Sequence, residues 1–280
     1  MPAINVSNLC KKYPKFYLDH VSFALDEGYI MGFIGRNGAG KTTTIKAMIG
    51  LVHHDGGEVS FGDVDFQKNE NACKQEIGLV LGGVDFYPKK RLRTITNVTK
   101  RFYSDWDEDV YASLLKRFDL DEDKRIDELS AGMKVKYALA LALSHHAKVL
   151  ILDEPTSGLD PVSRDDLLDL FQEIIEEGER SILFSTHITA DLERCADYIT
   201  YIRDGKIVFS EDRESFLNRY LDISGKVDQL RPELESHLIG VRRHRFGFEA
   251  LIPAHLDLDL SHFTTAKPSL DSIMIHLERG

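Results

Sequence analysis

The fold is decided by one stretch, Gly35-Arg36-Asn37-Gly38-Ala39-Gly40-Lys41-Thr42. It matches the G-x-x-x-x-G-K-[ST] pattern of a phosphate-binding loop at every position. The glycines let backbone N–H groups turn toward phosphate oxygens with no Cβ in the way. An apolar run, residues 29–34, precedes the loop and a helix-like run, residues 42–49, follows it. This strand–loop–helix context favours the motif over a glycine-rich turn with an incidental lysine.

The loop suggests a role for each of its polar side chains. Lys41 supplies a mobile charge for the β- and γ-phosphates, and the Thr42 hydroxyl suits a ligand of Mg²⁺. The following helix points its positive end at the same anion. We therefore predict that the chain binds ATP with Mg²⁺ and hydrolyses it. The expected nucleotide-binding residues of this region are Gly35, Asn37, Gly38, Ala39, Gly40, Lys41, Thr42 and Thr43.

Two carboxylates follow a second apolar run. Residues 149–152 lead directly into Asp153 and Glu154. Strand carboxyl ends line the ligand crevice of an open parallel sheet, so both acids are expected beside the phosphate loop. Asp153 then suits Mg²⁺, held directly or through water, and Glu154 suits activation of the attacking water. Without the loop, two acids after a strand would more often form a turn or cap a helix.

A histidine follows a third apolar run. His187 comes after residues 182–184 and is therefore expected at the same edge of the sheet. A lone histidine is more often a surface or core residue than a catalytic one. The neighbouring loop and acids favour the catalytic interpretation here.

The order of apolar runs predicts an α/β domain over residues 1–220, with a smaller domain over residues 221–280. Short runs at residues 4–9, 21–25 and 58–61 are typical of strands. Helical periodicity dominates from about residue 84 to 146, which predicts a mostly helical subdomain. In the tail we expect two strands within residues 238–252, turning near Gly247, and a closing helix over residues 269–277. The fold class is therefore α/β with a helical insert and a small α+β domain at the end.

Composition narrows the classes of function. Apolar residues make up 42% of the chain and charged residues 29%, so a packed globular protein is expected rather than a disordered one. The net charge of −11 argues against nucleic acid as the main partner. Three scattered cysteines predict free thiols in a reducing compartment. We expect a soluble, cytosolic protein, because the longest apolar-rich run, residues 138–143, is too short to span a bilayer.

In their order along the chain, these motifs resemble the nucleotide-binding subunit of an ABC transporter, over about residues 1–210. Leu129-Ser130-Ala131-Gly132-Met133 resembles the family's signature, usually Leu-Ser-Gly-Gly-Gln. Ser157-Gly158-Leu159-Asp160 resembles its D-loop, and Ser185-Thr186-His187 resembles its switch-histidine motif. Tyr13 lies where the family places an aromatic residue that stacks on adenine, although Phe16 and Tyr17 are close by.

The resemblance implies a head-to-tail homodimer or heterodimer with two ATP molecules at its interface. Each phosphate loop would face Ser130 and Gly132 of the partner, with Asp160 also at the nucleotide. It further implies an ATPase coupled to transport, bound to integral membrane permease subunits at the inner face of the cell membrane. The run as a whole is most similar to subunits of bacterial drug or peptide exporters.

One departure from the family pattern lies at Gly82-Gly83. The strand over residues 77–81 normally leads to a glutamine that senses Mg²⁺ and the attacking water, and glycine has no side chain for that role. Slower or differently gated hydrolysis follows as an expectation, unless Asp85 replaces the missing ligand.

Two other functions compete with the transporter subunit. One is a soluble ABC ATPase acting on ribosomes or DNA; such proteins usually carry two nucleotide-binding units or a long coiled coil, and this chain has one loop and no sustained heptads. The other is a regulator that binds nucleotide and barely hydrolyses it. The cluster Arg242-Arg243-His244-Arg245 is better explained as a solvated face, so no nucleic-acid partner is expected.

Overall fold

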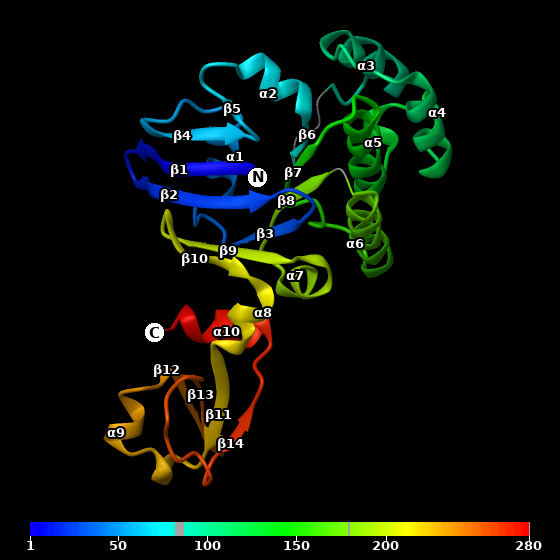
Figure 1. Ribbon diagram of the computed structural model, residues 1–280. Helices are drawn as coiled ribbons and strands as arrows, with labels where there is room; N and C mark the ends of the chain where they lie inside the picture. The colour runs from blue at the N-terminus through cyan, green and yellow to red at the C-terminus, as the bar shows by residue number, and fades with distance from the viewer. Residues whose placement is uncertain (82–86, 179, 280) are drawn as a thin grey trace. The chain divides into compact units, whose positions relative to one another are not determined.

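The computed structural model describes residues 1–81, 87–178 and 180–279 (Figure 1). It separates into two compact units, Met1–Ser210 and Glu211–Gly280. This division comes before the expected boundary at residue 220. It places α8 (Arg213–Asn218) in the second unit. Within the described part of the chain, no helix combines the length and apolar character needed to cross a bilayer.

A six-stranded sheet forms the centre of the first unit, in the order β10-β9-β3-β8-β7-β6. The pairs β9–β3, β3–β8, β8–β7 and β7–β6 are parallel. Every residue of β3, β7 and β8 is buried, which explains why the sequence shows an apolar run within each of these strands. The strands are β3 (Ile30–Ile34), β6 (Ile77–Leu81), β7 (Val149–Asp153), β8 (Ser181–Thr186), β9 (Tyr198–Arg203) and β10 (Lys206–Asp212).

A second, antiparallel sheet has the order β2-β1-β4-β5. One hydrophobic cluster joins residues of both sheets, such as Leu9 and Phe33, to Ile45 and Met48 of α1. The helix that follows the phosphate loop is therefore packed into the core, which holds the loop rigidly at the strand end. The elements are β1 (Pro2–Tyr13), β2 (Phe16–Asp26), β4 (Gly56–Phe61), β5 (Val64–Asp65), α1 (Lys41–Met48) and α2 (Glu70–Glu76).

The expected helical subdomain is present and projects to one side of the sheets (Figure 1). Its helices are joined by a buried hydroxyl cluster, in which Thr96 Oγ1 contacts the phenols of Tyr111 at 2.7 Å and Tyr137 at 2.9 Å. Burial raises the pKa of both phenols, so they stay neutral hydrogen-bonding groups. The beginning expected near residue 84 lies outside the described residues. The helices are α3 (Leu92–Thr99), η1 (Lys100–Phe102), α4 (Glu108–Arg117), η2 (Ile126–Glu128) and α5 (Ala131–Ser144).

Two further helices flank the sheet after β7 and β8. Pro161 is the first residue of α6 (Pro161–Glu176), where its fixed φ and missing N–H cost nothing. Asp160 caps that helix by accepting from the N–H groups of Val162 and Ser163. Helix α7 (Thr189–Cys195) follows β8 and was not expected.

The second unit is an antiparallel sheet, in the order β12-β13-β11-β14, with short helices. Its core contains Ile223, Phe248, Ala250 and Ile252. The hairpin expected in residues 238–252 and the closing helix are both present, whereas β11 and β14 were not expected. The elements are β11 (Tyr220–Gly225), η3 (Val227–Gln229), α9 (Pro232–Glu235), β12 (Ile239–His244), β13 (Gly247–Pro253), β14 (Thr264–Ala266) and α10 (Leu270–Leu277).

Candidate functional site

The phosphate loop connects β3 to α1 and depends on glycine geometry. Gly38 and Gly40 have φ values of +86° and +122°, a region that side chains with a Cβ rarely adopt. A Cβ on Gly40 would also lie 3.0 Å from the ring of Phe16. Helix α1 begins directly after Gly40, so its unpaired N–H groups open toward the loop.

Lys41 is held inside the loop, with 5% of its surface exposed. Its Nζ donates to the carbonyl of Gly35 at 2.7 Å and forms an ion pair with Glu154 Oε1 at 3.1 Å. A buried ammonium group needs such partners, because an unpaired charge is costly away from water. The predicted phosphate-binding cation and the predicted base are therefore in direct contact.

Glu154 stands in a strained position at the end of β7. Its φ of +52° lies in the left-handed region, which is uncommon for residues other than glycine. The Glu154 N–H is fixed by the Ser185 carbonyl at 3.1 Å and by Ser185 Oγ at 3.0 Å. The carboxylate contacts His187 Nδ1 at 2.7 Å through Oε2. Glu154 thus lies between an ammonium group and an imidazole.

Asp153 is the last residue of β7 and is almost completely buried. Its Oδ1 accepts a hydrogen bond from Ser185 Oγ at 2.6 Å. One serine hydroxyl therefore orients Asp153 and also accepts from the backbone of Glu154. Sequence reasoning did not single out Ser185 for this function; the available signal was its place at the end of β8, opposite Asp153.

A cavity of about 490 Å³ opens at the loop. Tyr13 and Phe16 both line it, whereas Tyr17, the third candidate for the aromatic platform, is outside the lining. Gly35 and Ala39 shape the loop without lining the cavity. The lining residues are Tyr13, Phe16, Arg36, Asn37, Gly38, Gly40, Lys41, Thr42, Thr43, Glu154, Ser157 and His187.

Asp153 is also absent from this lining, and the three expected site residues of the helical subdomain and α6 lie outside the cavity as well. Ser130 caps α5, its Oγ accepting from the N–H of Met133 at 3.2 Å, and Asp160 caps α6. A Cβ on Gly132 would be 3.8 Å from the Cβ of Ser163, so the first turns of the two helices are neighbours. The hydrogen bond from the Ser163 hydroxyl holds the pKa of Asp160 below its usual range.

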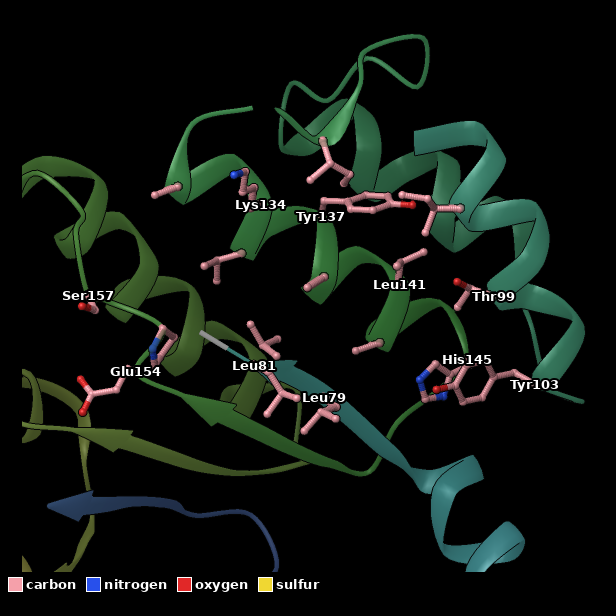
Figure 2. Close-up of a pocket in the computed structure, with 18 residues that line it drawn as sticks. Leu79, Leu81, Thr99, Tyr103, Lys134, Tyr137, Leu141, His145, Glu154 and Ser157 are labelled. Atoms are coloured by element: carbon pink, nitrogen blue, oxygen red, sulfur yellow. The ribbon is translucent and has the colours of Figure 1, made fainter. Parts of the chain in front are cut away.

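A second cavity, of about 660 Å³, lies between β6 and the helical subdomain (Figure 2). Its walls are mostly apolar, and Glu154 and Ser157 line it as well as the loop cavity. At its far end, His145 stacks on Tyr103 with a ring separation of 3.6 Å. Gly82-Gly83 and Asp85, which follow β6, lie outside the described residues.

A glycine-rich loop at the end of a buried strand, a buried lysine and an acid at the end of another strand of the same sheet together define a P-loop nucleotide hydrolase. Comparison with known proteins identifies the family. Residues 18–157 match the family model described as ABC transporter. The chain is 31% identical over 208 residues to the bacitracin transport ATP-binding protein BcrA of Bacillus licheniformis, covering 73% of this chain and 68% of that protein. It is 33% identical over 209 residues to the Nod factor export ATP-binding protein I of Burkholderia orbicola (strain AU 1054), covering 72% and 68%.

The structure resembles that of an ATP-binding subunit of an ABC transporter, with a TM-score of 0.69 and 28% identity over 78% of this chain and 92% of the other. The chain therefore belongs to the ABC transporter family. It is an ATP-binding subunit that hydrolyses ATP for transport.

Proposed function

We propose that this subunit drives an exporter whose membrane-spanning permease is a separate chain, and that it works as a head-to-tail dimer. The ATP hydrolysis that powers this proposal rests on the double contact of Glu154, with Lys41 on one carboxylate oxygen and His187 on the other. A phosphate-binding cation and a proton acceptor then share one cavity. ATP hydrolysis needs this combination.

In this proposal each member of the cluster has a distinct role. Glu154 is the general base for the attacking water, and Lys41 stabilises the charge on the β- and γ-phosphates. His187 orients the Glu154 carboxylate and lines the same cavity. Tyr13, supported by Phe16, is the platform for the adenine ring.

Mg²⁺ fits the donors at the base of the loop. Asp153 offers a buried carboxylate already oriented by Ser185, and the Thr42 hydroxyl lines the cavity. These are hard oxygen donors, which Mg²⁺ prefers, and Mg²⁺ sites in phosphoryl-transfer enzymes commonly use only one or two protein ligands. We propose Thr42 and Asp153 as those ligands. When bound, the ion neutralises charge on the phosphates.

The dimer accounts for the residues that the loop cavity does not include. Ser130 and Gly132 at the first turn of α5, and Asp160 beside them, form a surface of neighbouring helix N-termini. Such N-termini favour a negatively charged group. We propose that this surface faces the ATP bound by the phosphate loop of the partner subunit, in a homodimer or a heterodimer.

Export and a permease partner are inferred from the relatives and from the second cavity. One relative is named for export of Nod factor and the other for transport of bacitracin. The cavity of Figure 2 is the proposed permease contact, because its apolar walls reach Glu154 and an occupant there would act on the base. The subunit would then lie at the inner face of the membrane.

The dimer is tested with Glu154→Gln, which keeps the shape of the side chain and removes the base. With saturating ATP and Mg²⁺, this variant should elute as a stable dimer in size exclusion with light scattering, and as a monomer without nucleotide. Adding Ser130→Asp should abolish the dimer, because aspartate keeps the helix cap and places a negative charge against the phosphate.

Ser130→Asn is the matched control, since asparagine caps equally well without a charge and should leave the dimer intact. A Glu154→Gln protein that stays monomeric at saturating ATP contradicts the dimer. The permease is tested by affinity purification from detergent-solubilised membranes of the native host. Recovery with ribosomes or DNA instead would favour the soluble ATPase.

A further inference from the structure

A buried carboxylate lies behind the candidate site, on a helix that no motif identifies. Asp191 belongs to α7 and has no exposed surface. It does not line the loop cavity. A charge in such a place is costly unless its oxygens are paired and hydrogen bonded, so its partners explain its position.

The partners of Asp191 come from three different elements. Its Oδ2 accepts from Thr156 Oγ1 at 2.7 Å and from Thr186 Oγ1 at 3.3 Å. Its Oδ1 forms an ion pair with the guanidinium of Arg164 in α6. Both threonines are fully or almost fully buried. One carboxylate thus joins the turn after β7, the end of β8 and the first half of α6.

The contact with Thr186 holds the backbone around His187. Thr186 immediately precedes His187, and its hydroxyl also accepts from the N–H of Ile188 at 3.0 Å. The residues on both sides of His187 are therefore tied to one hydroxyl, which is itself fixed by Asp191.

The contact with Thr156 holds the turn that carries Glu154. Thr156 lies within the turn that the Ser157 N–H closes on the Glu154 carbonyl at 3.1 Å. The two turns fixed by Asp191 are thus the two whose side chains meet in the 2.7 Å contact between His187 and Glu154.

We propose that Asp191 is a positioning residue for ATP hydrolysis, which sets the distance between the Glu154 carboxylate and the His187 imidazole by holding both turns. The inference rests on the proposed roles of Glu154 and His187. It differs from them because Asp191 touches neither side chain and acts through Thr156 and Thr186. Misplacement of reacting groups by about 1 Å can cost about a hundredfold in rate, so loss of this link should act on turnover.

The experiment compares steady-state ATP hydrolysis and equilibrium ATP binding in the full chain. Asp191→Asn should lower kcat by about tenfold or more, with KM and ATP affinity within about twofold of the unaltered protein. Thr186→Val removes the hydroxyl at nearly constant shape and should also lower kcat. Thr186→Ser restores the hydroxyl and should recover most of the rate.

Thr200→Val is the matched control. Thr200 is equally buried in β9 and hydrogen bonds to Ser210 at 2.7 Å, so its loss removes a core hydroxyl without touching either turn. Equal losses of kcat in Thr200→Val and Thr186→Val would overturn the proposal, because the effect would then be general to the core. If Asp191→Asn does not fold, the Thr186→Val and Thr186→Ser pair decides.

Glu154→Gln, measured in parallel, distinguishes failure of the positioning role from failure of the proposed function. An inactive Glu154→Gln together with unchanged kcat in Asp191→Asn and Thr186→Val would overturn the positioning role and leave the proposed function intact. A fully active Glu154→Gln would instead remove the proposed base, and the positioning role with it.

Discussion

Ser185 and Lys41 both help to place the Glu154 carboxylate. The left-handed backbone of Glu154 costs on the order of 1–3 kcal/mol, and the double contact of its N–H with Ser185 maintains it. Lys41 then holds one oxygen of the carboxylate at 3.1 Å. Strain of this kind persists where several surrounding contacts hold the conformation in place. Here the strained conformation directs the Glu154 carboxylate into the cavity.

Substitutions at Lys41 and at Glu154 should have different effects on ATP affinity and turnover. Lys41→Ala removes the charge that meets phosphate, so ATP affinity and turnover should both fall. Glu154→Gln keeps the shape, so ATP affinity should stay within about twofold while turnover drops by about a hundredfold or more. Competition with a fluorescent nucleotide measures affinity, and single-turnover hydrolysis measures the chemical step.

Lys46→Ala serves as the control, because Lys46 lies in the same helix and outside the cavity lining. Equal losses of ATP affinity in Lys41→Ala and Glu154→Gln would contradict the division of roles.

Some residues of the site can be predicted from the sequence, and others cannot. Lys41, Glu154 and His187 each lie in a motif with fixed spacing, and the structure brings all three together. Asp191 is one of two acids in a short helix, and its position there follows no recognisable sequence pattern. Its burial and its three partners depend on tertiary packing, which local sequence does not encode.

Strand register assembles the site at the scale of elements. Asp153 pairs with Ser185 across β7 and β8, and Ile34 pairs with Thr186 across β3 and β8. The carboxyl ends of β3, β7 and β8 therefore lie at the same edge of the sheet, in register. The apolar runs in the sequence predicted the shared edge but not the register. Strand β10 was missed although Asp204-Gly205 precedes it; both residues have positive φ, as a two-residue hairpin turn requires.

The residue directly after α5 is a histidine that burial keeps neutral. His145 is 4% exposed, stacks on Tyr103 and contacts the Gln75 carbonyl through Nδ1 at 3.1 Å. Burial lowers the pKa of His145 from 6.5 to about 4. The unfolded chain therefore binds a proton at a higher pH than the folded protein, and acid favours unfolding in this window.

Stability should accordingly fall as the pH drops from about 6.5 to about 4, by up to about 3 kcal/mol from this group. His145→Phe keeps an aromatic ring for stacking and removes the titration, so its free energy of unfolding should depend less on pH in that window. Urea unfolding followed by the fluorescence of Trp106, the only tryptophan, reports on this subdomain. His53→Gln, at an exposed histidine, should keep the pH dependence of the unaltered protein; the same dependence in His145→Phe would refute the assignment.

On the scale of the whole molecule, nucleotide binding and the C-terminal sheet belong to different units with separate cores. Every residue that lines the loop cavity precedes residue 188. The loop nevertheless has a brace further along the chain. Gly205, in the turn between β9 and β10, donates its N–H to the Ala39 carbonyl at 2.9 Å, and a Cβ on Gly35 would lie 2.4 Å from the Ile202 carbonyl.

We therefore expect opposite effects on ATP binding from two truncated chains. A chain of residues 1–212 keeps β10 complete and should bind ATP within about twofold of the full chain, with a cooperative thermal transition by Trp106 fluorescence. A chain of residues 1–203 keeps every lining residue but loses the Gly205 brace and the edge strand, so its ATP affinity should fall by about tenfold or more, at roughly 1.4 kcal/mol per factor of ten.

Isothermal titration with ATP and Mg²⁺ compares the two truncated chains. If residues 1–212 aggregate or fail to bind ATP, the two units depend on one another for folding; if residues 1–203 bind normally, the turn does not brace the loop.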